Sequence, residues 1–182
     1  LTSNSKNSQS TISKFHFPNN YLFPNYNFIY PFGFYEYQPF IPYDNIFKFY
    51  HQFLDICNKY NYRSFLTSFK LIKKQKDNIL LNHTMNGFTL TFDFPKYPKE
   101  YKTQKKFFLE LNDILIKLNG KLYLGKTPIL LKNQFFEMYP KIHDFIKLKK
   151  NLDNVDIIQS SMYRRIFELY DEKDIKINRY NY

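Results

Sequence analysis

The segment from Gly120 to Lys126, GKLYLGK, places a phenol and an ammonium close together. Lys126 follows a short predicted strand, and the adjacent Gly125 would let the backbone approach a flat ring closely. An ammonium there could stabilise negative charge that develops on a bound group, or accept a proton if burial lowered its pKa. Tyr123 shares a face with Lys126 only if the chain turns at residues 124–125, which we expect. The plainer alternatives are a solvated cation and a core aromatic.

A second lysine stands in a predicted strand between two apolar residues. Lys70 lies between Phe69 and Leu71, so it shares a face with Ser68 and Ile72. A lysine on a strand needs a polar destination. An oxygen of a sugar or a phosphate would provide one, and an exposed edge position facing water would do so equally well.

Other kinds of chemistry find little support. The four histidines (His16, His51, His83 and His143) are scattered without the spacing of metal ligands or of a catalytic triad. Cys57 is the only cysteine and lies on a predicted apolar helix stripe, which favours a small core residue over a nucleophile. The four glycines form no phosphate-binding loop. We therefore expect no metal site.

The chain is strongly basic, with a formal net charge of +11. Such a charge suits an acidic partner, a phosphorylated substrate or an anionic membrane surface. A codon bias toward Lys, Asn, Ile, Phe and Tyr has the same effect, and few of the basic residues are Arg, which bidentate phosphate binding would favour. With 43% hydrophobic residues the chain can bury a core, and its 182 residues suit one domain.

The pattern along the chain predicts the elements that position these residues. Alternating apolar residues predict strands at 34–41, 64–73, 87–94 and 121–124, and helical spacing predicts helices at 45–59 and 102–119, with Gly120 as a C-terminal cap. In the first helix the predicted buried stripe is Ile46, Tyr50, Phe53, Cys57 and Tyr60. The order β-α-β-β-α-β predicts an α+β fold of the ferredoxin-like kind, an antiparallel sheet with helices on one face.

Further helices are predicted at 130–138, 140–151 and 160–170. Residues 1–14 are polar and without apolar periodicity, which indicates a flexible tail or linker, and 171–182 are expected to form a C-terminal tail. The single domain then spans residues 15–170. No apolar run reaches the roughly 18 residues that cross a bilayer. We expect a cytoplasmic protein or one peripheral at a membrane surface.

Several segments resemble, in order and spacing, those of decaprenylphosphoryl-ribose oxidases. NGKLYLGK at 119–126 and FFEMYP at 135–140 are similar to the family's Gly-Arg-Leu-Tyr-x-x-Lys and Phe-x-x-Met-Tyr-Pro segments. Further similar segments are GFYEYQ at 33–38 with Pro42, SFLTSFK at 64–70, GFTLTFDFP at 87–95 and SSMYRR at 160–165. The resemblance covers about residues 15–169.

This resemblance implies the substrate domain of a flavoenzyme of the vanillyl-alcohol-oxidase fold, whose FAD-binding half precedes it. Such enzymes move a hydride from a sugar carbinol carbon to FAD, and in the named family the substrate is a polyprenyl-phosphoribose oxidised at its 2-hydroxyl for cell-wall glycans. The expected partners are an N-terminal FAD-binding half, a polyprenyl-phosphate sugar or related polyol, and a short-chain reductase.

The resemblance also implies roles for single residues. Lys126 and Tyr123 would contact the flavin or the reacting hydroxyl, as catalytic and cofactor-binding residues. The substrate-binding residues would be Lys70, Gln38, Glu36, Thr89 and Thr91. Glu36 stands where relatives often carry Gln, and the two threonines stand where they can carry Asn and Cys, so we expect a pocket that differs from theirs at these positions.

Two other interpretations stay open. A basic ferredoxin-like unit with strand aromatics is also typical of an RNA-recognition module, although Asn86 and Asp93 depart from its signature and nucleic acid is the less expected partner. The chain could also be an inactive piece of a split or decayed oxidase gene.

Overall fold

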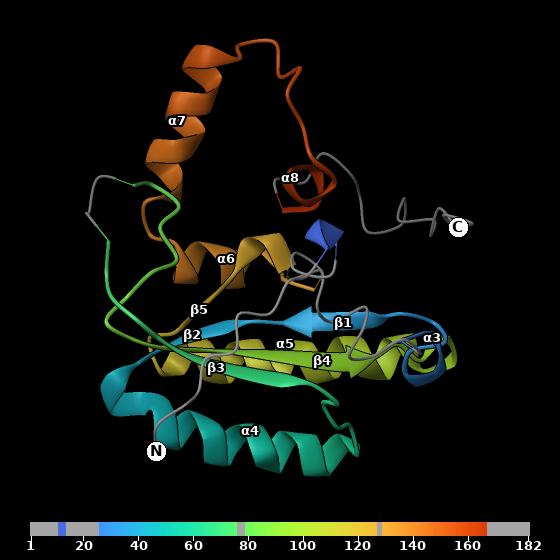
Figure 1. Ribbon diagram of the computed structural model, residues 1–182. Helices are drawn as coiled ribbons and strands as arrows, with labels where there is room; N and C mark the ends of the chain where they lie inside the picture. The colour runs from blue at the N-terminus through green and yellow to red at the C-terminus, as the bar shows by residue number, and fades with distance from the viewer. Residues whose placement is uncertain (1–10, 14–25, 76–78, 127–128, 167–182) are drawn as a thin grey trace.

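The computed structural model describes residues 11–13, 26–75, 79–126 and 129–166. Within them, an antiparallel sheet of five strands carries two long helices on one face, α4 (Ile46–Tyr60) and α5 (Tyr101–Lys117) (Figure 1). The predicted α+β class is confirmed. Most of the predicted tail at 1–14 and all of the one at 171–182 lie outside the described residues.

Strand β4 (Gly87–Pro95) forms the centre of the sheet. It pairs along its length with β3 (Thr67–Ile72) on one side, and with β1 (Phe34–Tyr37) and β2 (Pro39–Pro42) on the other. β2 also pairs with the short β5 (Lys121–Leu122). All of these pairs are antiparallel, and the chain follows the order β-α-β-β-α-β that the sequence predicts.

The first predicted strand, 34–41, is wrong in one respect, because it is broken into β1 and β2 at Gln38. Pro39 has no backbone N–H to donate to the ladder, which interrupts regular pairing at that point. The Thr89 hydroxyl instead donates to the Pro39 carbonyl oxygen at 2.9 Å. The Tyr123 N–H donates to the Gln38 carbonyl at 3.0 Å, so the backbone at this break remains hydrogen-bonded to the segment after β5.

The core lies between the sheet and the two long helices. The Phe53 ring of α4 stacks on Phe92 of β4 at 4.2 Å between centroids, and Phe107 of α5 lies 5.0 Å from Phe94 in an edge contact. Fully burying an aromatic side chain of this size stabilises the fold by about 1.5–3 kcal/mol. The predicted stripe of α4 is wrong at Tyr50, which is 44% exposed, because its buried stripe instead runs through Ile46, Phe49, Phe53, Ile56 and Cys57.

The end of α5 also differs from the prediction. Asn119, not Gly120, takes the left-handed conformation, with a φ of 56°. Asn is the residue after Gly that best tolerates this conformation. Gly120 is required for another reason, since a Cβ there would lie 2.2 Å from the Leu115 side chain and 2.8 Å from the Phe40 carbonyl oxygen.

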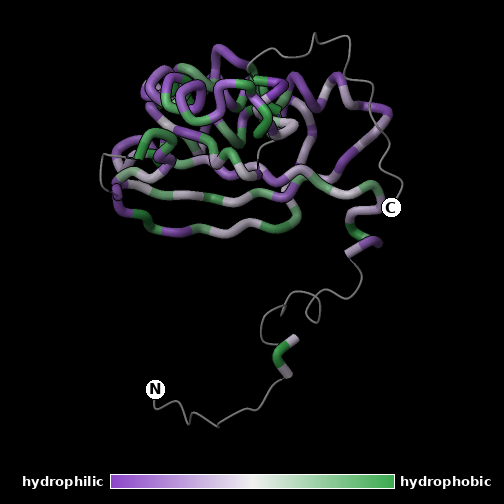
Figure 2. Tube along the Cα trace, turned by 90° about the horizontal axis from the view of Figure 1, so that it is seen from above, coloured by the Kyte–Doolittle hydropathy of each residue, from purple (hydrophilic) through white to green (hydrophobic). Residues whose placement is uncertain are grey.

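Three further helices follow the sheet. α6 (Lys132–Met138) packs beside α5, where the Gln134 amide donates to the Leu109 carbonyl at 3.2 Å, and α7 (Ile142–Leu152) and α8 (Ser161–Ile166) come after it. Figure 1 shows α6 and α8 on the side of the sheet opposite to α4. Figure 2 shows hydrophobic and hydrophilic stretches alternating along the elements. In the described part of the chain, no helix is long and apolar enough to span a bilayer.

Candidate functional site

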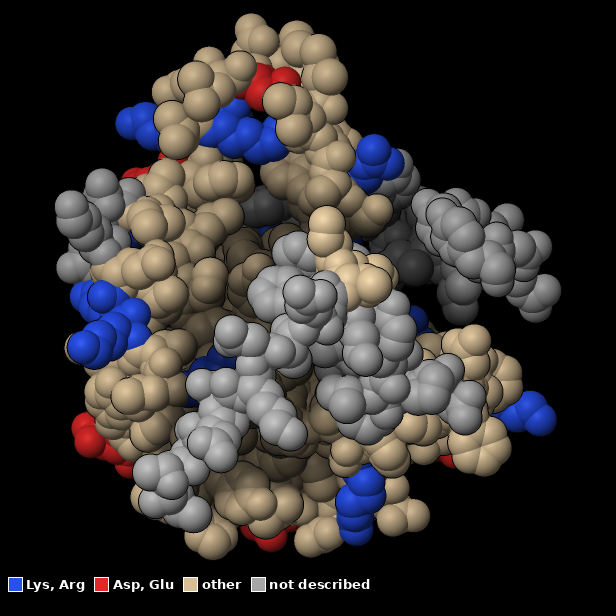
Figure 3. Space-filling view, in the orientation of Figure 1, with Lys and Arg blue, Asp and Glu red and all other residues tan. Residues whose placement is uncertain are grey.

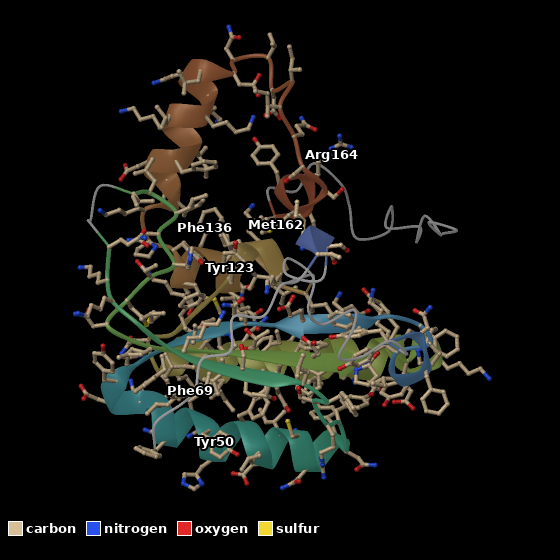
Figure 4. All side chains as sticks on the ribbon, in the orientation of Figure 1. Tyr50, Phe69, Tyr123, Phe136, Met162 and Arg164 are labelled. Carbon is tan, nitrogen blue, oxygen red and sulfur yellow. The ribbon has the colours of Figure 1, made fainter. Side chains whose placement is uncertain are left out.

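The face of the sheet opposite to α4 and α5, here called the site face, carries the polar residues. Tyr37, Phe92 and Phe94 pack toward the helices, so their strand neighbours point the other way. The residues that therefore share the site face are Glu36, Gln38, Phe40, Ser68, Lys70, Thr89, Thr91, Asp93 and Lys121. Figure 4 shows Tyr123 on this side, and Phe69 and Tyr50 on the other.

The register arranges these residues in cross-strand pairs. Glu36 of β1 lies opposite Asp93 of β4, and at the other end Thr89 lies between Phe40 and Lys70. The predicted substrate-binding residues thus meet on one surface although they are far apart in sequence. Lys70 is exposed on the outer strand β3, in register with Thr89.

Lys126 reaches this surface because the chain turns after β5. Residues Leu124–Lys126 form one turn of 3-10 helix, η3, and the Lys126 N–H donates to the Tyr123 carbonyl at 3.2 Å. The Lys126 ammonium then forms an ion pair with Glu36, with 2.5 Å between Nζ and Oε1. The turn expected from the sequence is therefore present, and the side chains of Tyr123 and Lys126 lie on the same face of the sheet.

Asp93 is a buried acid beside this ion pair. Its residue is 5% exposed, and its Oδ1 has no hydrogen-bond partner among the described residues. Burial, and to a smaller extent the Glu36 carboxylate, raises the pKa of Asp93 to about 6, while Lys126 acts in the opposite direction. The hydroxyl of Tyr30 is also buried, and no residue that the structure describes is its hydrogen-bond partner. Such orphan groups, with a carboxyl that titrates near neutral pH, are typical of functional sites.

The middle of the site face is held by hydrogen bonds among its own residues. The Gln38 side-chain amide donates to the Thr89 hydroxyl at 3.3 Å, and that hydroxyl donates onward to the Pro39 carbonyl. Thr89 is 3% exposed, so in this structure its hydroxyl holds Gln38 in place. Thr91 is half-buried and lies opposite Ser68.

Tyr123 belongs to a group of three rings. Its ring centroid lies 4.9 Å from His83 and 6.4 Å from Phe40, and His83 lies 4.8 Å from Phe40. A Cβ on Gly125 would lie 3.1 Å from the Tyr123 ring, so the glycine lets the turn close against that ring. Burial and the neighbouring Lys121 lower the pKa of His83, which favours its neutral form.

Sequence reasoning missed Asp93 and His83 as site residues. Asp93 alternates with Phe92 and Phe94, so once those rings are assigned to the core it must face the site. No local pattern marks His83, because the loop between β3 and β4 brings it to Tyr123. Within the described residues, no group of three His, Cys, Asp or Glu side chains could hold a metal ion.

The orientation of β4 argues against an RNA-recognition module. In such modules rings on the open face of the sheet stack against bases. Here Phe92 and Phe94 are 3% and 1% exposed and face the helices, whereas Thr89, Thr91 and Asp93 occupy the site face. The described surface has no row of stacking rings along this strand.

The site face combines a cation, a phenol, an amide and a buried acid, which suits the binding of a hydroxylated ligand beside a group that gains negative charge. The family model for D-arabinono-1,4-lactone oxidase matches residues 26–166, and the chain belongs to this family.

A curated relative agrees with this family. The decaprenylphosphoryl-beta-D-ribose oxidase of Mycolicibacterium smegmatis is 28% identical over 134 residues, which cover 74% of this chain and 28% of the relative. The predicted resemblance to this kind of oxidase is confirmed. The chain spans little more than a quarter of the relative's length.

Proposed function

We propose that this chain is the substrate-side part of an FAD-linked oxidoreductase that oxidises a sugar carbinol. The observation that carries the proposal is the meeting of Lys126, Tyr123, Gln38 and Glu36 on the site face of the sheet. The family match supports an oxidoreductase, and the name of the mycolicibacterial relative supports a sugar substrate linked to a polyprenyl phosphate. In the same terms, the fold would be the substrate domain of a vanillyl-alcohol-oxidase-type enzyme.

In this proposal Lys126 acts as a cation. Its ammonium forms an ion pair with the Glu36 carboxylate, with 2.5 Å between Nζ and Oε1. An ammonium can donate to a ring edge or a hydroxyl that becomes more negative during the reaction. Tyr123 adds a phenol on the same face, and its ring contacts His83 and Phe40.

The residues of the site face fit the ring end of FAD and not its phosphates. Lys126 and Tyr123 would hold that ring end, and the bound cofactor would supply the hydride acceptor. The four glycines of the chain occur singly and not as a phosphate-binding loop. We therefore expect an N-terminal FAD-binding half as the partner of these residues, with a short-chain reductase acting on the oxidised sugar.

The other polar residues of the site face would bind the substrate. The Gln38 amide can donate to and accept from a sugar hydroxyl, and Thr91 offers a second hydroxyl nearby. Lys70 is exposed across from Thr89 and can reach an oxygen of the ligand from the open edge of β3. Glu36 adds a negative charge that favours a ligand with donors at that end.

The test is reconstitution. The chain would be co-produced with the FAD-binding region of the mycolicibacterial relative, and purified complex would be mixed anaerobically with a polyprenyl-phosphoribose analogue. We expect bound yellow flavin that bleaches when the sugar is added. Lys126→Ala should slow bleaching at least about tenfold, since one lost charge-assisted contact costs about 1.5–3 kcal/mol.

A matched control separates this effect from a general loss of charge. Lys117, at the exposed end of α5, lies on the helix side of the sheet, so Lys117→Ala should bleach at the wild-type rate. Equal rates for Lys126→Ala and Lys117→Ala would remove Lys126 from the reaction. Full bleaching by the FAD-binding region without this chain would defeat the proposed function.

A further inference from the structure

The loop between α7 and α8 carries an exposed apolar surface that the proposed reaction does not use. Figure 1 shows this loop at the top of the molecule, away from the sheet. Four aliphatic side chains within seven consecutive residues, here called the aliphatic tip, are strongly exposed: Leu152 at 79%, Val155 at 70%, Ile157 at 79% and Ile158 at 76%. Single exposed apolar residues are ordinary, but a group of this kind marks an interaction surface.

Hydrogen bonds hold the aliphatic tip in one shape. The Asp153 carboxylate accepts from the backbone N–H groups of Ile157 and Ile158, at 2.8 and 2.9 Å. The Lys149 ammonium of α7 pairs with the same carboxylate at 2.8 Å and also with the Asp156 carboxylate. The Asp156 N–H donates to the Asp153 carbonyl oxygen at 3.1 Å. The loop is therefore a hydrogen-bonded turn that leaves the two isoleucine side chains outside.

These bonds favour a lipid surface as the partner. A backbone N–H that leaves water without a hydrogen bond is costly. The N–H groups of Ile157 and Ile158 are already bonded within the loop, and the side chains of Lys149 and Asp153 are only 13% and 10% exposed. The aliphatic tip can therefore enter an apolar layer without stranding these groups. Protein-binding surfaces instead rely on Trp, Tyr and Arg anchors, among which Leu and Val are under-represented.

The charges beside the tip suit anionic headgroups. Lys147 and Lys150 of α7 are exposed, whereas the two aspartates of the loop share the Lys149 ammonium. The other acid of α7, Asp144, lies in its first turn, at the far end of the helix. Figure 3 shows Lys and Arg side chains just below the upper edge of the molecule, which the α7–α8 loop forms in Figure 1. Lysines beside an inserted apolar group attract anionic lipids.

We propose that the aliphatic tip inserts into the surface of a phospholipid bilayer, with Lys147 and Lys150 at the headgroups of anionic lipids. Figure 1 shows α7 and this loop on the side of the sheet that carries α6 and α8, which is also the side of the site face. A bound chain therefore turns its site face toward the membrane. This binding goes beyond the proposed oxidation and needs neither flavin nor sugar.

Tryptophan fluorescence tests the insertion, because the chain contains no Trp and one introduced indole reports a single position. With vesicles of phosphatidylcholine and phosphatidylglycerol in equal parts, the emission of Ile158→Trp should shift to shorter wavelength, and brominated acyl chains should quench it. Phe47→Trp is the matched control, since Phe47 is 78% exposed on α4, at the opposite side of the molecule. A vesicle-induced shift that is absent in Ile158→Trp, or equal in both variants, would overturn the proposal.

Vesicle sedimentation measures the strength of binding. Ile157→Ser with Ile158→Ser should lower the partition coefficient at least about tenfold, because both aliphatic side chains are lost while the backbone bonds of the loop remain. Phe47→Ser should leave it unchanged. Lys147→Gln with Lys150→Gln should lower it about fivefold per lysine on the mixed vesicles, and not on phosphatidylcholine alone. Equal sedimentation of the double serine variant and Phe47→Ser would mean that net charge alone holds the chain, and the proposal would be wrong.

The alternative partner for this surface is a protein. In the complex with the FAD-binding region of the mycolicibacterial relative and without lipid, the emission of Ile158→Trp should stay as in the chain alone. A shift there that vesicles do not change further, or a dimer of the chain that Ile157→Ser with Ile158→Ser abolishes, would show a protein contact and refute membrane insertion. Flavin reduction without vesicle binding would defeat this proposal alone, and vesicle binding without flavin reduction would defeat the proposed function alone.

Discussion

Asp93 offers a direct test of the site's electrostatics. Its pKa rises from 3.8 to about 6 in the folded chain. A group whose pKa is higher in the folded state binds its proton more tightly there, so its stabilising effect is complete below the unfolded pKa and is lost as the pH rises through the folded one. The free energy of unfolding that Asp93 contributes therefore falls between about pH 4 and about pH 6. Above this range the buried carboxylate destabilises the fold.

The magnitude follows from the shift. A difference of about two units corresponds to about 3 kcal/mol, and solvent at the partly exposed Glu36–Lys126 pair screens part of it, so we expect about 2 kcal/mol. Asp93→Asn removes the ionisation and keeps the size of the side chain. The variant should gain about 2 kcal/mol of unfolding free energy relative to wild type when the pH is raised from about 4 to about 8.

Urea denaturation followed by circular dichroism at both pH values measures this change. The comparison between variant and wild type cancels the titration of every other group that the substitution leaves alone. Asp55→Asn, at an exposed position of α4, is the matched control and should show no pH-dependent difference. The difference in unfolding free energy between Asp93→Asn and wild type could instead be the same at both pH values. That result would refute the reasoning that burial disfavours the charged form of Asp93.

Further predictions concern the surroundings of this acid and the fold. Because Glu36 raises and Lys126 lowers the pKa of Asp93, Glu36→Gln should lower that pKa and Lys126→Ala should raise it, which carboxyl NMR can measure. Gly87→Ala should cost about 3 kcal/mol or more in urea unfolding, because a Cβ there would lie 2.0 Å from a backbone oxygen of β2. Burial raises the pKa of Cys57 to about 12, so a thiol reagent at about pH 8 should label it only after unfolding.

The fold could be predicted from the sequence because its elements carry clear periodic patterns. The alternation in Gly87–Pro95 reflects apolar side chains directed toward the helices, and the helical spacing in Tyr101–Lys117 reflects one buried face, so the predicted bounds of both elements lie within two residues of the observed ones. The stripe of α4 was misplaced because Phe49 and Tyr50 are adjacent aromatics and either fits helical spacing. Only packing against Phe53 and the sheet decides that Phe49 is inside.

The site could be predicted only where motifs marked it. Lys126, Tyr123 and Gln38 stand in segments with family counterparts, whereas the strand register that sets Glu36 opposite Asp93 joins residues far apart in the chain. The contact of His83 with Tyr123 depends on the path of the loop between β3 and β4. Neither relation leaves a local signal, since each arises from tertiary pairing.

The glutamate at position 36 links the substrate question to the mechanism. The Glu36 carboxylate pairs with the Lys126 ammonium, and after burial it is the next cause that raises the pKa of the adjacent Asp93. A negative charge here disfavours an anionic group of a ligand at this end of the site face. In the proposed function, we therefore expect the ligand to present hydroxyl donors toward Glu36.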